Sequence, residues 1–423
     1  MSMLAPMPRS EIGPSPRAED SWTLHSEARP SLEWLISPVA KEDFFEQYWE
    51  KRPLVVKRDQ SNYFNSLLSF EEVDRVITTL DRRYPDISLK NAARPMSADE
   101  YTIGNTLDVA KVYQLFKEGS TVTLAYLDTV IPTLTLFCRS LEKEFSFPFQ
   151  TNVYMTPAGA QGAKPHYDTH DVFVLQVAGT KRWTIFGTPI ELPLPGQDFD
   201  AAVHELGAPT LEFELEAGDV AYIPRGIVHE ARSTRTVSLH VTAGILRYTW
   251  ADLLLEFIAG ASLNDPTFRK ALPPGFARSD FDRTQARETL AHLLLQARST
   301  ANFDAALDYF ISKFLRECPP LLEGQMGQVA ALDCLTIDSV VGARQGVIFR
   351  LQTNGDSEAL DCYGRRITFP SFVHDELRFA LSNPKFVIRS LPGKLDEAGK
   401  LTLIRRLIQE GMVVALDVAV YAK

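Results

Sequence analysis

Between residues 150 and 245 the chain is dense in short strand patterns, which constrain its fold more than any other feature of the sequence. Turns that contain Gly or Pro separate most of the segments. In chain order these are NVYMTP, DVFVLQVA, KRWTIFG, LEFELEA, DVAYIP, VHEARS and TVSLHVTAGI. Strands so closely spaced pair with one another in antiparallel sheets. The run VFVLQV is apolar on both faces, as expected of a central strand that is covered on both sides. We therefore expect a double-sheet jelly roll that encloses a site between its sheets.

One residue separates His166 from Asp168 in this region. On a strand, such residues project from the same face, so their imidazole and carboxylate can reach one point. A third ligand must come from a distant strand, and His229 qualifies because it follows the turn-rich sequence GDVAYIPRGIV. Two His and one carboxylate form the facial triad of non-haem Fe(II) oxygenases, which leaves coordination positions open for a co-substrate and O2. An H-x-D pair alone is also common as a solvated surface pair, and the distal motif favours the metal site.

Several longer motifs surround these residues. They are Asn152-x-Tyr154-x-Thr156-Pro157, Gln161-Gly162, HYDxHDVF from His166, QVxGxKRW ending at Trp183, GDVAYIPRGIVH, Ser238-Leu239-His240 and, upstream, Phe44-x-x-x-YWEKRPL. In these motifs the chain resembles the JmjC-type 2-oxoglutarate oxygenases, in particular their ribosomal oxygenase (cupin-4) branch. The resemblance implies a cupin-type double-stranded β-helix in which His166, Asp168 and His229 bind Fe(II).

The same resemblance implies that Lys181 grips the distal carboxylate of 2-oxoglutarate and that Asn152 and Tyr154 line that pocket. Taken alone, Lys181 is typical of a solvated lysine at the end of a hairpin. A lysine turned into a pocket needs an anionic partner, which a dicarboxylate would supply. Asn152 and Tyr154 share a strand face, and their alternative role is to satisfy polar groups inside a barrel.

Most of the 8 histidines are expected to lie outside the metal site. His240 is the strongest competitor of His229, because it lies in SLHVTAG on the same strand face as Thr242. We expect His240 and Thr242 to face the pocket and to hold the co-substrate or the metal ligands. The remaining histidines are assigned elsewhere: His25 to the N-terminal lead, His170 to a turn that directs it away, His204 to a rim loop, His292 to a helix and His374 to the C-terminal domain.

Charge and composition limit the other functions. The formal net charge of −10 argues against a surface made mainly for nucleic acid. The 4 Cys lie far apart without C-x-x-C spacing, so neither a zinc site nor a disulfide framework is expected. No apolar run is long enough to predict a membrane span, and the N-terminus lacks the apolar core of a secretory signal. These features predict a cytoplasmic protein.

The sequence predicts four parts. Residues 1–30 are rich in Pro and are expected to form a disordered lead, and residues 31–246 form the helix-flanked JmjC/cupin catalytic domain. Residues 247–320 contain three amphipathic helical patterns, which either cover the barrel or, as the resemblance implies, form a homodimerisation module. Residues 321–423 resemble the C-terminal winged-helix domain of the ribosomal oxygenases.

The resemblance implies oxidative decarboxylation of 2-oxoglutarate at Fe(II), coupled to hydroxylation of a substrate C–H group with O2. Our first hypothesis is a protein hydroxylase that acts on an Arg or His side chain of a ribosomal protein. The alternatives are the same chemistry on a biosynthetic peptide or a methyl-lysine, and a non-enzymatic winged-helix regulator whose barrel senses a ligand. The complete triad with Lys181 favours an enzyme. Some bacterial members of the branch carry Arg where Lys181 stands, which bears on the subgroup and its substrate. DNA binding is not expected, because the basic residues after Tyr363 are spread along the sequence.

Overall fold

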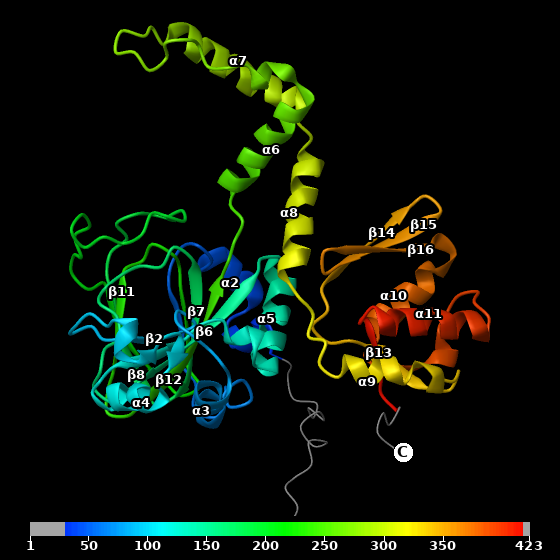
Figure 1. Cartoon of the computed structure of the whole chain (residues 1–423), viewed down its shortest axis with the longest axis horizontal. Helices are drawn as coiled ribbons and strands as arrows, with labels where there is room; N and C mark the ends of the chain where they lie inside the picture. The colour runs from blue at the N-terminus through cyan, green and yellow to red at the C-terminus, as the bar shows by residue number, and fades with distance from the viewer. Residues whose placement is uncertain (1–29, 418–423) are drawn as a thin grey trace, which may run out of the picture.

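The computed structural model describes residues 30–417. The predicted disordered lead, with His25, lies outside the described residues apart from Pro30. Figure 1 shows a β-rich body that holds the first half of the chain, helices α6, α7 and α8 that project from it, and a C-terminal part beside the body. No helix within the described range has the length and apolarity needed to cross a membrane.

Two antiparallel sheets form the centre of the body. The larger has seven strands in the order β1-β10-β7-β12-β6-β5-β2, and the smaller has three in the order β11-β8-β9. The strands are β1 (Leu54–Val56), β2 (Ile87–Lys90), β5 (Thr121–Leu124), β6 (Phe149–Thr156), β7 (Asp171–Ala178), β8 (Thr180–Ile185), β9 (Leu211–Glu216), β10 (Val220–Ile223), β11 (His229–Ser233) and β12 (Ser238–Ile245). A short hairpin of β3 (Thr102–Ile103) and β4 (Thr106–Leu107) lies apart from these sheets. The prediction of a β-rich cupin-type core with flanking helices is confirmed.

The flanking helices begin where local sequence signals place them. They are α1 (Leu32–Ile36), α2 (Lys41–Gln47), α3 (Phe70–Thr79), α4 (Val109–Lys117) and α5 (Pro132–Phe145). Ser69 caps α3 in a reciprocal capping box with Glu72. Pro132 begins α5, where a missing backbone N–H costs little. These helices pack against the larger sheet.

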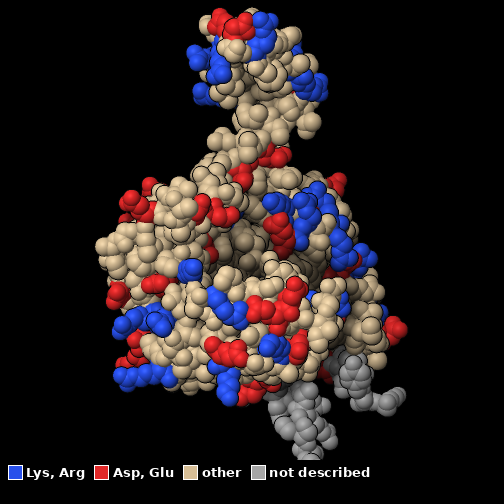
Figure 2. Space-filling view, turned by 60° about the vertical axis from the view of Figure 1, so that its left-hand side comes forward, with Lys and Arg blue, Asp and Glu red and all other residues tan. Residues whose placement is uncertain are grey.

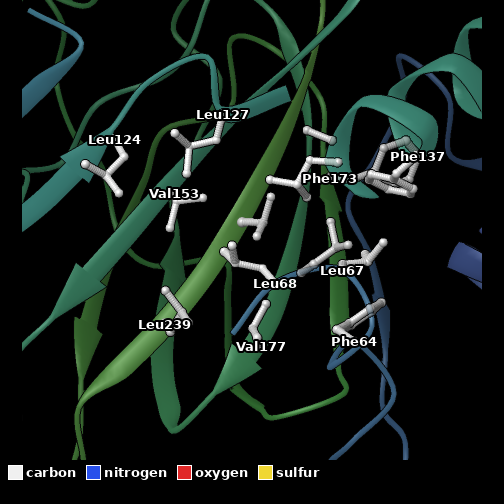
Figure 3. Packing of buried hydrophobic residues seen from close by; sticks show 14 of the residues in the cluster. Phe64, Leu67, Leu68, Leu124, Leu127, Phe137, Val153, Phe173, Val177 and Leu239 are labelled. Carbon is white, nitrogen blue, oxygen red and sulfur yellow. The ribbon is translucent and has the colours of Figure 1, made fainter. Parts of the chain in front are cut away.

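The two faces of the larger sheet have different roles because its side chains alternate. On one face lies the main hydrophobic core, which packs against α1, α3 and α5 and includes Phe64, Leu67, Leu124, Phe137, Val153, Phe173, Val177 and Leu239 (Figure 3). On the other face, Val172 and Val174 of the central strand β7 join a second cluster with Trp183 and Ile185 of the smaller sheet. Strand β7 is therefore apolar on both faces, as its sequence predicts. The site lies on this inner side, between the sheets.

Three helices follow the body: α6 (Trp250–Asn264), α7 (Thr284–Thr300) and α8 (Phe303–Glu317). In the space-filling view the outer part of this helical module forms a lobe on a narrow, largely uncharged neck (Figure 2). The C-terminal part contains α9 (Gln325–Ala330), α10 (His374–Ser382), α11 (Glu397–Gln409) and two three-stranded sheets. Its strands are β13 (Val340–Ala343), β14 (Phe349–Asn354), β15 (Ser357–Cys362), β16 (Arg365–Pro370), β17 (Phe386–Val387) and β18 (Val413–Ala415).

The turn between β7 and β8 requires glycine. Gly179 has a φ of +66°, and a Cβ there would overlap the carbonyl oxygen of Val237. Gly179→Ala should lower the free energy of unfolding by about 2 kcal/mol or more, because strain adds to overpacking. Gly187→Ala is the matched control, since no heavy atom lies within 4 Å of its added Cβ. Equal urea midpoints for the two variants would contradict this account of the turn.

Candidate metal centre

The structure brings His166, Asp168 and His229 together. One ligand atom from each lies within 4.8 Å of the others. The Nε2 atoms of His166 and His229 lie 4.0 and 3.8 Å from the two oxygens of Asp168. The imidazole nitrogens and the carboxylate thus converge on one point, as a facial triad requires.

Local structure around His166 differs from the expectation. His166 and Asp168 were placed on a strand, but residues 157–170 form a loop with isolated bridges only. Both backbone hydrogen bonds of one such bridge pair His166 with His229, at 3.1 and 2.8 Å. The loop is extended at that point because its backbone pairs with the first residue of β11. The side chains therefore converge through pairing with a distant segment rather than through a strand of their own.

Backbone carbonyls orient both imidazoles. His166 Nδ1 lies 2.8 Å from the carbonyl oxygen of Lys164, and His229 Nδ1 lies 3.0 Å from that of Ile227. If each Nδ1 carries the proton and donates it there, each Nε2 is left as a free lone pair directed at Asp168. This is the usual arrangement of a metal-binding His, in which the second nitrogen is held by an acceptor.

Protonation states also suit a metal. Burial, helped by the nearby charge of His166, lowers the pKa of His229 to about 4, so this imidazole is neutral at physiological pH. Burial of Asp168 opposes its ionisation, but electrostatic interaction with the nearby imidazoles of His229, His170 and His166 outweighs burial and lowers the pKa of Asp168. Metal ligands must be deprotonated to bind, so His229 and Asp168 need to release few protons.

A buried lysine lies beside the triad without an anionic partner. Lys181 is 4% exposed, and burial lowers its pKa to about 7. Its Nζ donates to Thr156 Oγ1 at 3.3 Å, and no carboxylate in the described chain is within ion-pair distance. Its neighbours Trp183 and His240 are themselves buried. An unpaired buried ammonium is costly, which fits a pocket that takes an anion.

The register between strands β6 and β12 determines which side chains lie near Lys181 on the inner face of the larger sheet. Strands β6 and β12 pair so that Asn152 faces Thr242, Tyr154 faces His240 and Thr156 faces Ser238. The rings of Tyr154 and His240 stack at 4.8 Å with an angle of 5° between them. His240 is 2% exposed and its Nδ1 has no hydrogen-bond partner. His240 thus lies buried between Tyr154 and Trp183, while the triad is completed by His229.

Asn152 has a further contact. Its Oδ1 accepts a hydrogen bond from the backbone N–H of Tyr126 at 3.3 Å, and its carbonyl oxygen accepts one from Thr242 Oγ1 at 3.4 Å. The side chain of Asn152 therefore anchors the loop after β5 at the edge of the wall.

Two residues near the site were missed or misplaced by the sequence analysis. Thr156 contacts Lys181, and alternation along β6 could have found it, because it continues the face of Asn152 and Tyr154. His170 was expected to point away, but its ring packs against Gly244 of β12 and its charge acts on Asp168 and His229. A turn in the sequence does not reveal which way its side chains point.

Two cavities lie away from the triad. One of about 710 Å³ lies where α5, α6 and α8 meet, with Tyr248 and Phe310 in its wall. The other, of about 1090 Å³, lies between α5 and the C-terminal part, with Trp34 and Arg344 in its wall. Neither of these two cavities includes a triad residue.

Comparisons with known proteins identify a family. The JmjC domain family matches residues 129–253. Ribosomal oxygenase 1 of Danio rerio is 30% identical over 430 residues, which cover 90% of this chain and 78% of that protein. Ribosomal oxygenase 1 of Gallus gallus is 32% identical over 325 residues, covering 72% of this chain and 53% of that protein.

A second name occurs among the relatives. A protein of Drosophila mojavensis called bifunctional lysine-specific demethylase and histidyl-hydroxylase NO66 is 30% identical over 315 residues. The match covers 70% of this chain and 35% of that protein. This chain therefore spans about half or less of the Gallus and Drosophila proteins.

Among solved structures, the Escherichia coli ribosomal oxygenase YcfD has a similar fold. Its TM-score is 0.54 at 17% sequence identity, over 89% of this chain and 98% of that one. A further YcfD structure, with a TM-score of 0.53, is a complex with cobalt and 2-oxoglutarate.

The depressed pKa of Lys181 makes stability depend on pH. Between about 7 and its usual value of 10.5, an unfolded chain keeps a proton on Lys181 that the folded chain has lost. Stability of the ligand-free protein should therefore rise with pH in this window, by at most about 1.4 kcal/mol per pH unit from this group. Urea denaturation at pH 7 and pH 9 should show a smaller rise in Lys181→Met than in the parent. Lys270→Met, at an exposed lysine, should show the same rise in stability as the parent. If stability rose as much in Lys181→Met as in the parent, the lowered pKa of Lys181 would be contradicted.

Proposed function

Because this chain belongs to the ribosomal oxygenase family of JmjC-domain proteins, we propose that it is an Fe(II)- and 2-oxoglutarate-dependent hydroxylase of a ribosomal protein side chain. One observation carries the proposal: the ring of Trp183 contacts both His229 of the triad and a buried lysine, Lys181, that has no carboxylate of the described chain within ion-pair distance. A divalent metal fits the triad, and a dicarboxylate fits the lysine.

Each residue has a role in this reaction. His166, Asp168 and His229 would hold Fe(II), which supplies the activation of O2 coupled to decarboxylation of 2-oxoglutarate to succinate and CO2. Lys181 would take up a proton and bind the distal carboxylate, which offsets the cost of burying its charge. Tyr154 and His240 form a stacked wall that excludes water from that side, and Asn152 and Thr242 extend it.

Charge supports a basic substrate. The rim loop, residues 187–209, carries Glu191, Asp198, Asp200 and Glu205 and no Lys or Arg, and the whole chain is at −10. Ribosomal proteins are the substrate class in the names of the relatives, one of which is called a histidyl-hydroxylase. We favour His over Arg on that ground. The second candidate, demethylation of a methyl-lysine, rests on the other half of the same name.

Loss of a triad ligand should abolish turnover. His166→Ala and Asp168→Ala remove a ligand, so succinate formation with Fe(II), 2-oxoglutarate and O2 should fall to background. Mass spectrometry of ribosomal proteins from cells with and without the enzyme should show a hydroxylated residue that depends on His166. Near-parental succinate formation by either variant would refute the triad.

Lys181→Ala should weaken 2-oxoglutarate binding far more than Fe(II) binding, because it removes the cation that faces the distal carboxylate. Anaerobic titration of each ligand measures both affinities. The adjacent Arg182, which is exposed on the other face of β8, supplies the control variant Arg182→Ala. If Arg182→Ala lost co-substrate affinity and Lys181→Ala kept it, the two assignments would be reversed.

We also propose that the helical module of residues 247–320 mediates a homodimer. Its helices α6 and α7 expose many large apolar side chains: Trp250, Leu254, Leu255, Leu263, Leu290, Leu294 and Leu295. Leu255 and Leu295 are 72% and 73% exposed. A projecting lobe with this much exposed apolar surface is typical of an interface (Figures 1 and 2). An isologous pair would bury it twice.

Light scattering at micromolar concentration should therefore give the mass of a dimer. Leu255→Asp places a charge on the apolar face and should shift the mass towards the monomer. Ile103→Asp, at a side chain that is 74% exposed in the β3–β4 hairpin, should leave the dimer intact. A monomeric parent would refute the module's proposed role.

For residues 321–423 we propose a winged-helix domain that docks substrate rather than DNA. Helices α10 and α11 pack against the small sheet of β13, β17 and β18, and the meander β14–β16 would be the wing. Most of its arginines are paired with acids: Arg365 and Arg406 with Glu410, Arg366 with Asp361, and Arg389 with Asp338 and Glu397. Paired, dispersed cations make a poor phosphate-binding stripe.

Four free cysteines support a reducing cytoplasmic location.

A further inference from the structure

The two chain segments that carry Asp168 and His229 meet at a buried ion cluster. Arg225 stands four residues before His229, and Asp171 stands three residues after Asp168. Arg225 Nη1 donates to Asp171 Oδ2 at 2.7 Å, and its backbone N–H donates to Asp171 Oδ1 at 3.4 Å. Asp171 is fully buried, and Arg225 is 6% exposed. The pair therefore fixes the distance between the two segments with little access of water.

A backbone contact extends this link to the triad itself. The N–H of Gly226, the residue after Arg225, donates to the carbonyl oxygen of Asp168 at 3.1 Å. Gly226 has a φ of +82°, and a Cβ there would overlap the carbonyl oxygen of Ile190. A shift of the Arg225–Gly226 turn would thus move Asp168 and His229 relative to each other.

Glu50, far away in the sequence, completes the cluster. The same Arg225 Nη1 donates to Glu50 Oε1 at 2.6 Å, across 175 residues of sequence. The backbone N–H of Glu50 donates to Tyr222 Oη at 3.0 Å, and Tyr222 Oη donates to Asp171 Oδ1 at 3.0 Å. Burial would lower the pKa of Arg225, but the charges of Asp171 and Glu50 hold it above its usual value. Arg225 therefore stays charged.

The backbone at Glu50 is strained. Its φ is +55°, in the left-handed region that favours glycine. A residue with a long side chain is disfavoured there, so the backbone alone would select Gly. Strain of this kind is maintained where the side chain has a role. The contact visible for this side chain is the one with Arg225.

We propose that Glu50 is a positioning residue for the metal centre, which acts through Arg225 and Asp171 to hold the segments of Asp168 and His229 at their binding distance. The inference rests on the proposed function, because it takes the triad as the metal site. Outer partners of metal ligands typically change metal affinity when they are removed, without unfolding the protein.

The variant Glu50→Gly distinguishes an effect on metal affinity from an effect on protein stability. It removes the carboxylate, relieves the left-handed strain and keeps the backbone N–H that binds Tyr222. Arg225 keeps its partner Asp171, so no buried charge is left alone. Co(II) titration of the full-length, ligand-free protein, followed by its visible absorption, should show an affinity about tenfold weaker than that of the parent. The thermal midpoint should stay close to that of the parent. Glu50→Gln keeps an acceptor for Arg225 and should retain more of the affinity than Glu50→Gly.

Asp219→Asn is the matched control. Asp219 is a buried carboxylate at the opposite end of β10, where it accepts from Lys57 Nζ, from the Arg58 N–H at 2.7 Å and from the Glu216 N–H at 2.8 Å. This variant should lose stability and bind Co(II) as the parent does. Parental Co(II) affinity and absorption in Glu50→Gly would overturn the positioning role, as would an equal loss of affinity in Asp219→Asn. Co(II) binding by the parent that His166→Ala leaves unchanged would instead overturn the proposed function.

Discussion

Two backbone hydrogen bonds between His166 and His229 are the constraint on which the site depends. They join a loop to the first residue of β11 and set two imidazoles side by side. Since each Nδ1 points at a nearby carbonyl oxygen, the orientation of both rings follows from the backbone alone. Asp168 needs only to reach the same point from two residues along the loop. The fold itself thus orients the three side chains, so a metal bound there would cost them little conformational entropy.

The two sheets and the helices packed on them hold the His166–His229 backbone bridge in place. The larger sheet packs its outer face on a helical core, and strand β7 is buried on both faces. Alternation along β6 then sends Val153 into this core and Asn152 and Tyr154 into the pocket. Apolar burial on one face thus fixes the positions of polar groups on the other. A polar wall would be poorly ordered without such a support.

The inner side of the larger sheet contains buried polar and ionisable groups that would be unfavourable in an ordinary hydrophobic core. Lys181 is buried without an acid, His240 has an unpaired Nδ1, and His229 is kept neutral by burial. Such groups destabilise a ligand-free protein, and their concentration at one place indicates a site whose partners come from outside. By contrast, the buried Arg225 forms ion pairs with both Asp171 and Glu50.

The sequence by itself determined which segments become strands and helices, because periodicity and turn residues are local signals. It also indicated His166, Asp168, His229 and Lys181 as candidates, since their motifs are specific. Only the tertiary structure decided that His166 lies on a loop rather than a strand and that the ring of His170 packs against Gly244 of β12. It alone brought Glu50 to Arg225, across 175 residues. The physical reason is that local patterns report the face of a residue, whereas burial, pKa and ion pairing depend on neighbours that only the packed chain supplies.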